Sequence, residues 1–248
     1  MLVILPVLIA LFTPAQAGAT EFRLSSQCPP SFEKLPDGTC RLVTLYSFYS
    51  SPHGHGGLKA KLEPPRNRYR PQEIDLGRYL FFDPILSADR DQACSSCHDP
   101  AFGFGDGRRR SIGKQELERS APTLWNVAFG DRFMWDGRAA SLEGQAHLPL
   151  FNSDEMANTP QQLVANLSAS PVYWRLFDEV YGEAPTVRTV ARALAAFETS
   201  LISLNSRYDR YAHGDTAALD DAEIRGLNVF RGFVARCSQC HIPPLFTD

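Results

Sequence analysis

The chain has 248 residues, with 25 lysines and arginines against 28 aspartates and glutamates, for a formal net charge of -3. Hydrophobic residues make up 44% and charged residues 21%, which excludes a disordered chain and supports one or two folded domains. The near-neutral charge argues against a nucleic-acid-binding protein, which would carry a basic stripe. A polytopic membrane protein is excluded, because only one long apolar run exists, at the extreme N-terminus.

That apolar run, residues 2–12, carries no charge and is followed by the small-residue pattern Ala-Gln-Ala at 15–17. It is short for a membrane span and is typical of a secretory signal peptide, although no lysine or arginine precedes it. We expect residues 1–17 to be removed, leaving a periplasmic chain with no stable membrane span. A buried core helix is the alternative, which Pro6 and Pro14 disfavour.

From residue 18 to residue 68 the chain is rich in Pro, Gly, Ser and Tyr and shows no helical period, so we expect an irregular extension. Cys28 and Cys40 flank a turn-rich stretch within it, and in an oxidising compartment we expect them to form a disulfide. A reactive or metal-binding pair is the alternative. His53 and His55 lie in a glycine-rich stretch that is typical of a surface loop.

Helical patterns dominate the rest. Pro71 suits a first helical position, and apolar residues follow at helical spacing up to Asp83. A second helix is predicted over 187–204, with Thr186 as its N-cap. A third begins at Asp220 or Asp221, with a capping box, and presents Ile224, Leu227, Phe230 and Val234 on its apolar face. The prediction is a mostly α fold.

Two copies of one motif decide the chemistry: Cys94-Ser95-Ser96-Cys97-His98 and Cys237-Ser238-Gln239-Cys240-His241. The pattern Cys-x-x-Cys-His is the attachment signature of c-type haem, and the composition predicts only roughly 0.004 chance copies. Two thiols one turn apart bond to the vinyl groups of one porphyrin, and the adjacent histidine binds the iron. We therefore predict two covalently bound c-type haems. A redox dithiol and a structural zinc site are weaker alternatives.

The two motifs are 143 residues apart, which fits one haem in each of two lobes. We expect a first haem lobe over 69–182 and a second over 183–248. Each haem would be held by its own cysteines and histidine: Cys94, Cys97 and His98 in the first lobe, and Cys237, Cys240 and His241 in the second.

Nine segments around the motifs form a wider pattern: LGRYLFFDPILS (76–87), CSSCHDP (94–100), FGDGR (104–108), SAPTLWNVAF (120–129), MWDGRAASLEGQA (134–146), DEM (154–156), LAAFETSL (194–201), NSRYDRY (205–211) and CSQCHIPPLFTD (237–248). In these segments the chain resembles the bacterial di-haem cytochrome c peroxidase family, including its MauG-type branch. The resemblance runs from about residue 70 to the end and does not include the extension before it.

The resemblance implies that the first haem is the peroxidatic one and that the second relays electrons. Trp135 matches the tryptophan that lies between the haems in the family, and Gln145, Pro149 and Glu155 match its peroxide pocket. The chemistry is consistent, because one carboxylate beside an open iron face can take a proton from peroxide and return it to the departing oxygen. Gln145 would orient peroxide, and Pro149 would help to keep that face free of a ligand.

The chain departs from the family in three places. Many members carry a second histidine ligand in the loop after the first motif, but residues 99–119 contain none and the next histidine is His147. This favours a permanently five-coordinate first haem, as in the MauG-type branch. Ser120 stands where the family has an asparagine ligand for calcium, and its hydroxyl is a poorer ligand, so calcium is doubtful. Only seven residues follow His241.

The family continues well beyond that point and there supplies the sixth ligand of the second haem, usually Met or Tyr. The methionines here, Met1, Met134 and Met156, are not placed for it. We therefore expect a truncated second lobe with an exposed haem, or, as an alternative, ligation by His53 or His55.

The leading interpretation is a peroxidase that reduces hydrogen peroxide to water. Its electrons would come from a small periplasmic donor, a c-type cytochrome or a cupredoxin. One alternative is a MauG-type di-haem oxidase that modifies a partner protein. Another is a di-haem electron-transfer cytochrome without turnover, which would have two six-coordinate haems.

Overall fold

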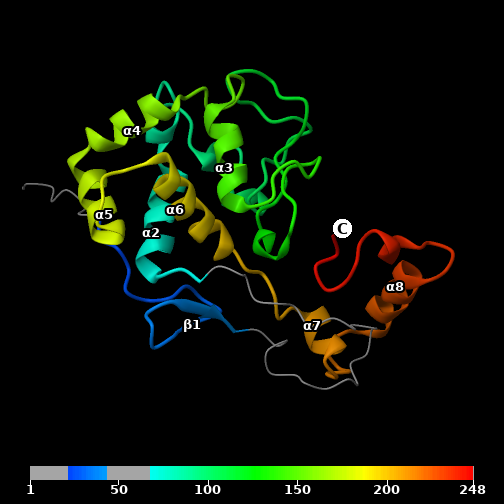
Figure 1. Cartoon of the computed structure of the whole chain (residues 1–248). Coiled ribbons are helices and arrows are strands. Elements are labelled where there is room, and N and C mark those ends of the chain that lie inside the picture. The colour runs from blue at the N-terminus through cyan, green and yellow to red at the C-terminus, as the bar shows by residue number, and fades with distance from the viewer. Residues whose placement is uncertain (1–21, 44–67, 248) are drawn as a thin grey trace, which may run out of the picture.

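The computed structural model describes residues 22–43 and 68–247 (Figure 1). The predicted signal peptide, His53 and His55 lie outside these residues. The described part is mostly helical, as predicted. Its strands and helices are β1 (Phe32–Lys34), β2 (Cys40–Leu42), α2 (Pro71–Phe82), α3 (Leu142–Phe151), α4 (Pro160–Ser168), α5 (Pro171–Tyr181), α6 (Val187–Thr199), α7 (Arg207–Ala212) and α8 (Asp221–Arg231). None of these helices is long and apolar enough to cross a membrane.

Helices α2 and α6 form the centre of the core and lie side by side (Figure 1). Gly77 lies where they meet, because a Cβ atom there would come within 1.8 Å of the Ala193 carbonyl oxygen. Only glycine permits so close an approach of the two backbones. The apolar faces of α3, α4 and α5 complete the same core. Its fully buried side chains include Leu76, Leu80, Phe81, Leu150, Leu163, Leu176, Phe177, Val190 and Leu194.

The helix predicted over 187–204 ends earlier, at Thr199. Thr186 caps its start, since the Thr186 hydroxyl accepts a hydrogen bond from the N–H of Thr189 at 3.1 Å. Leu201 is still buried against the core although it lies beyond the helix. The helical spacing of apolar residues therefore extends beyond the end of α6. A buried residue just after a helix can match this spacing as well as one inside the helix.

Within its described residues, the extension before residue 69 contains one short hairpin that the sequence pattern did not predict. Strands β1 and β2 pair antiparallel, with Phe32 opposite Leu42. Gly38 closes the turn with φ +83°, and Asp37 Oδ1 accepts the N–H of Thr39 at 2.9 Å. The short strands and the missing alternation explain why the pattern did not predict a hairpin.

The hairpin is joined to the core. Cys28 and Cys40 form a disulfide, and Cys40 packs with Tyr69, Ile74 and Ala196. The N–H of Cys40 donates to the Tyr69 carbonyl at 2.9 Å. The extension therefore covers the outer side of the α2–α6 pair.

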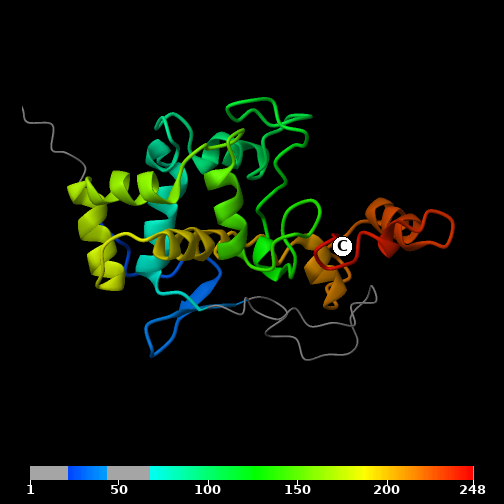
Figure 2. The ribbon, with the colours of Figure 1, turned by 45° about the horizontal axis from the view of Figure 1, so that its top comes forward.

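The expected lobe boundary at residue 183 assigns α6 to the second lobe. Helix α6 lies beyond it, yet α6 shares one core with α2 and α3. The segment that carries the second motif begins after α6, and both views show α7 and α8 beyond the end of that helix (Figures 1 and 2). A boundary drawn from motif spacing could not show which core a helix between the motifs joins.

The predicted capping box of α8 is present, since Asp220 Oδ1 accepts the N–H of Glu223 at 2.9 Å and Glu223 Oε2 accepts that of Asp220 at 2.9 Å. Helix α8 ends at Arg231, so Val234 is not on its apolar face, and Val234 is 98% exposed. No residue of α8 is buried.

Candidate haem sites

The first motif folds into a single 3-10 turn, η2 (Cys94–Ser96), directly after an extended residue. The N–H groups of Cys97 and His98 both donate to the Cys94 carbonyl, at 3.2 and 2.9 Å. This turn brings the backbones of Cys94, Cys97 and His98 together in one fixed conformation. The arrangement fits covalent attachment of one haem.

His98 is prepared as a metal ligand by its other ring nitrogen. Nδ1 lies 2.9 Å from the Phe104 carbonyl oxygen, which can only accept, so Nδ1 carries the proton. Burial lowers the pKa of His98, which favours the neutral ring. Nε2 therefore keeps a lone pair for iron, and the hydrogen bond holds the ring orientation.

The first motif lines a cavity that also contains the three predicted pocket residues, Gln145, Pro149 and Glu155. Helix α3 provides the first two, and the loop after it provides the third. Apolar side chains from α3 and α6 make up much of the remaining wall. The other lining residues are Gln92, Ala93, Gly113, Leu124, Ala146, Leu150, Met156, Leu194 and Glu198.

Two contacts orient the polar pocket residues. Asn152, the C-cap of α3, donates from Nδ2 to Glu155 Oε1 at 2.8 Å. Gln145 Nε2 lies 3.6 Å from the sulfur of Met134. Pro149 lies inside α3 and has no N–H to offer the carbonyl of Gln145, four residues earlier. Neither Asn152 nor Met134 was predicted, since neither carries a motif of its own.

A second carboxyl in this cavity was also missed. Glu198, on α6, is 6% exposed, and its Oε2 is buried without a hydrogen-bond partner. Burial, and then the charge of Glu143, raises the pKa of Glu198 to about 8. The charge of Glu198 in turn helps burial to raise the pKa of the Cys94 thiol to about 12. The raised pKa of Glu198 favours its protonated, uncharged form. Its place in the apolar period of α6 could have drawn attention to it.

The structure does not bring Trp135 into this cavity. Its ring is 61% exposed, and its Nε1 donates to the Ser120 carbonyl at 2.9 Å. His147 is not a cavity residue either, because its ring stacks on Phe151 with the centroids 6.1 Å apart. Among the described residues, no group of three or more histidines, cysteines or acidic side chains could hold a metal ion.

The second motif repeats the local geometry of the first. In η5 (Cys237–Gln239) the N–H groups of Cys240 and His241 donate to the Cys237 carbonyl, at 3.2 and 2.9 Å. His241 Nδ1 lies 3.1 Å from the Phe246 carbonyl, so its Nε2 is also available to iron. Cys240 and His241 are exposed. The donor set fits a second c-type haem.

Two haem-attachment motifs on a mostly helical fold are typical of c-type haem proteins. Similarity to known proteins shows which family of c-type haem proteins this chain belongs to. The model of the di-haem cytochrome c peroxidase family matches residues 71–217. The methylamine utilization protein MauG of Methylorubrum extorquens is 40% identical over 221 residues, which cover 85% of this chain and 62% of that protein. Cytochrome c551 peroxidase of Pseudomonas aeruginosa is 37% identical over 175 residues, covering 68% of this chain and 50% of that protein.

Solved structures agree with this result. A MauG-like protein associated with microbial copper homeostasis matches with a TM-score of 0.67 and 33% identity, covering 73% of this chain and 56% of its own. The diheme peroxidase BthA from Burkholderia thailandensis matches with a TM-score of 0.62 and 30% identity, covering 73% and 52%. The chain belongs to the di-haem cytochrome c peroxidase and MauG family. It spans about half to three fifths of the length of these relatives.

Proposed function

We propose that this chain is a peroxidase that reduces hydrogen peroxide to water in the cavity of the first motif. One observation carries the proposal. Gln145, Pro149 and Glu155, which are far from the motif in sequence, line the same cavity as its cysteines and histidine. An electron carrier without turnover has no use for an oriented carboxylate and amide beside its iron.

The haem would supply the redox chemistry of oxygen–oxygen bond cleavage when bound. The chain's residues hold it and control protons. Cys94 and Cys97 would attach the porphyrin, and His98 Nε2 would bind the iron. Residues 99–119 hold no histidine, and His147 stacks on Phe151 outside the cavity lining. We therefore propose that no second histidine from these positions competes with peroxide for the iron.

Glu155 is the general acid and base in this scheme. Asn152 holds Oε1, so the other carboxylate oxygen is free to take a proton from hydrogen peroxide and return it to the oxygen that leaves as water. The amide of Gln145 orients the peroxide, and Pro149 adds no side-chain donor that could compete for iron.

Cys237, Cys240 and His241 would hold the second haem, which would supply electron-relay chemistry, and Trp135 would lie between the two haem sites. The exposure of Cys240 and His241 suits an entry point for a small donor protein, a c-type cytochrome or a cupredoxin. We place the protein in the periplasm, where c-type haem is attached and the Cys28–Cys40 disulfide persists.

Oxidation of a residue on a partner protein is the second candidate. Two observations favour it: the missing histidine in residues 99–119 and the 40% identity to the MauG protein. Both candidates use the same cavity, and they differ in what delivers the electrons.

The test is peroxide-dependent oxidation of a reduced c-type cytochrome by protein matured in a periplasm with haem-attachment machinery. We expect Glu155→Gln to lower kcat/KM for hydrogen peroxide by about 100-fold or more, because the proton relay is lost. The exposed Glu118→Gln is the matched control and should leave the rate unchanged. Absence of turnover in haem-loaded wild type would refute the peroxidase proposal and favour the second candidate. A fast rate that Glu155→Gln leaves unchanged would refute the role of Glu155.

A further inference from the structure

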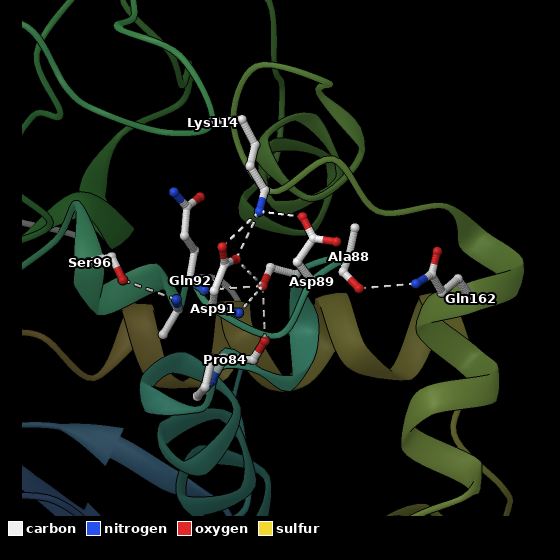
Figure 3. A network of polar contacts seen from close by, with 10 residues as sticks. Pro84, Ala88, Asp89, Asp91, Gln92, Ser96, Lys114 and Gln162 are labelled. Carbon is white, nitrogen blue, oxygen red and sulfur yellow. Dashed lines mark hydrogen bonds and ion pairs between the residues drawn. The ribbon is translucent and has the colours of Figure 1, made fainter.

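A lysine lies at the centre of a polar network beside the first haem cavity (Figure 3). Lys114 Nζ lies 2.7 Å from Asp89 Oδ2 and 2.9 Å from each carboxylate oxygen of Asp91. The hydrogen bond from Lys114 holds the pKa of Asp91 below its usual range. Three oxygens around one ammonium fix the lysine more firmly than a single surface ion pair would.

On one side this network fixes the chain that leads into the first motif. Ser87 Oγ accepts the N–H groups of Asp91 and Gln92, each at 3.1 Å, and Ser96 Oγ accepts that of Ala93 at 3.0 Å. Figure 3 shows the side chain of Lys114 reaching towards Asp91 and Asp89 in this segment. The side chain of Lys114 is thereby tied to residues 87–96, which include the first cysteine of the motif.

On the other side the backbone of Lys114 holds the loop that carries Glu155. The N–H groups of Lys114 and Gln115 both donate to the Asp154 carbonyl, at 2.9 and 3.3 Å. Gly113 touches the same loop, because a Cβ atom there would lie 2.3 Å from the Asp154 oxygen and 2.8 Å from the Glu155 Cα. The far end of the Glu155 loop is anchored separately, where Asn158 Nδ2 donates to the Leu86 carbonyl at 2.8 Å.

We propose that Lys114 is a positioning residue that clamps the Glu155 loop over the first haem cavity. The inference rests on the proposed function, since it assigns a role to the loop that carries the acid–base residue. Its side chain binds the segment before the motif, and its backbone binds the residue before Glu155. The clamp keeps the carboxylate oriented and limits the size of the ligand that reaches the iron.

The test uses haem-loaded protein and two probes, imidazole and hydrogen peroxide. We expect Lys114→Met to bind imidazole to ferric iron about tenfold faster, because the loop opens more often, while kcat/KM for peroxide falls by about tenfold. Lys114→Arg should restore most of both values. Lys34→Met is the matched control and should change neither value, since Lys34 lies on the exposed hairpin, where its Nζ donates to the Ser26 carbonyl at 3.0 Å.

Recovery of both values in Lys114→Arg, with haem content equal to that of wild type, separates positioning by the ammonium group from a general loss of structure, which would leave haem unattached. If Lys114→Met matures poorly, Asp91→Asn tests the same contact with the lysine retained. The clamp would be overturned if Lys114→Met and Asp91→Asn bound imidazole at the wild-type rate, or if Lys34→Met showed the same increase in that rate. A wild type without peroxide turnover would refute the proposed function alone, because the imidazole comparison still judges the clamp.

Discussion

The two haem motifs share their backbone geometry and differ in everything around it. Each forms one 3-10 turn, and each histidine directs Nδ1 to a carbonyl five or six residues ahead. The first motif borders a cavity lined by residues of α3 and α6, and its Cys94 packs against the main core. The second lies on a segment whose helix α8 buries no residue and whose Phe233 is 80% exposed.

This difference shows that five residues suffice to build an attachment turn, whereas a reaction site needs walls contributed by distant segments. The second segment is held by a few polar and aromatic contacts. Arg207 forms two hydrogen bonds of 2.6 Å with Glu223, and Phe246 packs edge to face on Phe230 and Tyr208. The first motif therefore lies in a walled cavity that suits the proposed reaction, while Cys240 and His241 of the second motif are exposed among the described residues.

The largest expected effect comes from removing each pair of motif cysteines. Cys94→Ala/Cys97→Ala should lose the haem that fills a cavity in the core and lower the free energy of unfolding by about 3 kcal/mol or more. Cys237→Ala/Cys240→Ala should lose the other haem and lower it by less than about 1 kcal/mol, since few contacts surround that site. Covalent haem per chain and thermal unfolding measure both. Equal losses of stability would contradict the contrast between the two regions.

The next effect concerns Glu198, a buried carboxyl in the cavity of the first motif. Its pKa rises from 4.5 to about 8 on folding, so the folded state binds its proton more tightly. The stability from this proton is fully present below pH 4.5 and is lost as the pH rises towards 8. In wild type we expect the free energy of unfolding to fall by an amount on the order of a few kcal/mol between pH 5 and pH 8 because of Glu198. Glu198→Gln should remove this fall.

Thermal unfolding of wild type and variant at several pH values checks this. Glu143→Gln should reduce the same pH dependence more weakly, because the charge of Glu143 is the smaller cause of the shift. A parallel pH dependence in wild type and Glu198→Gln would show that Glu198 does not titrate in this range.

The smallest expected effect comes from replacing one helical glycine by alanine in each region. Gly77→Ala places a Cβ against the Ala193 carbonyl and should destabilise the protein by about 1–3 kcal/mol. Gly226→Ala, in α8, meets no atom within 4 Å and should stabilise its segment by about 0.5–1 kcal/mol. Denaturant unfolding followed with a local probe in each region measures the two changes. The same sign in both would show that the regions do not differ in packing.

Some features were determined by the sequence alone because they depend on near neighbours. The spacing of Cys94, Cys97 and His98 predicts the attachment turn, and Asp220 with Glu223 predicts a cap that closes within one turn. The starts of α2 and α8 were predicted on the same basis. Local chemistry of this kind needs no knowledge of the rest of the chain.

The tertiary structure alone decided which core each element joins. It ended α6 at Thr199, paired β1 with β2, placed α6 in the first core, and left Trp135 exposed. It also revealed Glu198 and Lys114, whose surroundings come from segments far away in the chain, and Asn152, which donates to Glu155. A side chain's burial and its distant contacts depend on the packing of whole helices, and the period of one segment does not contain that information.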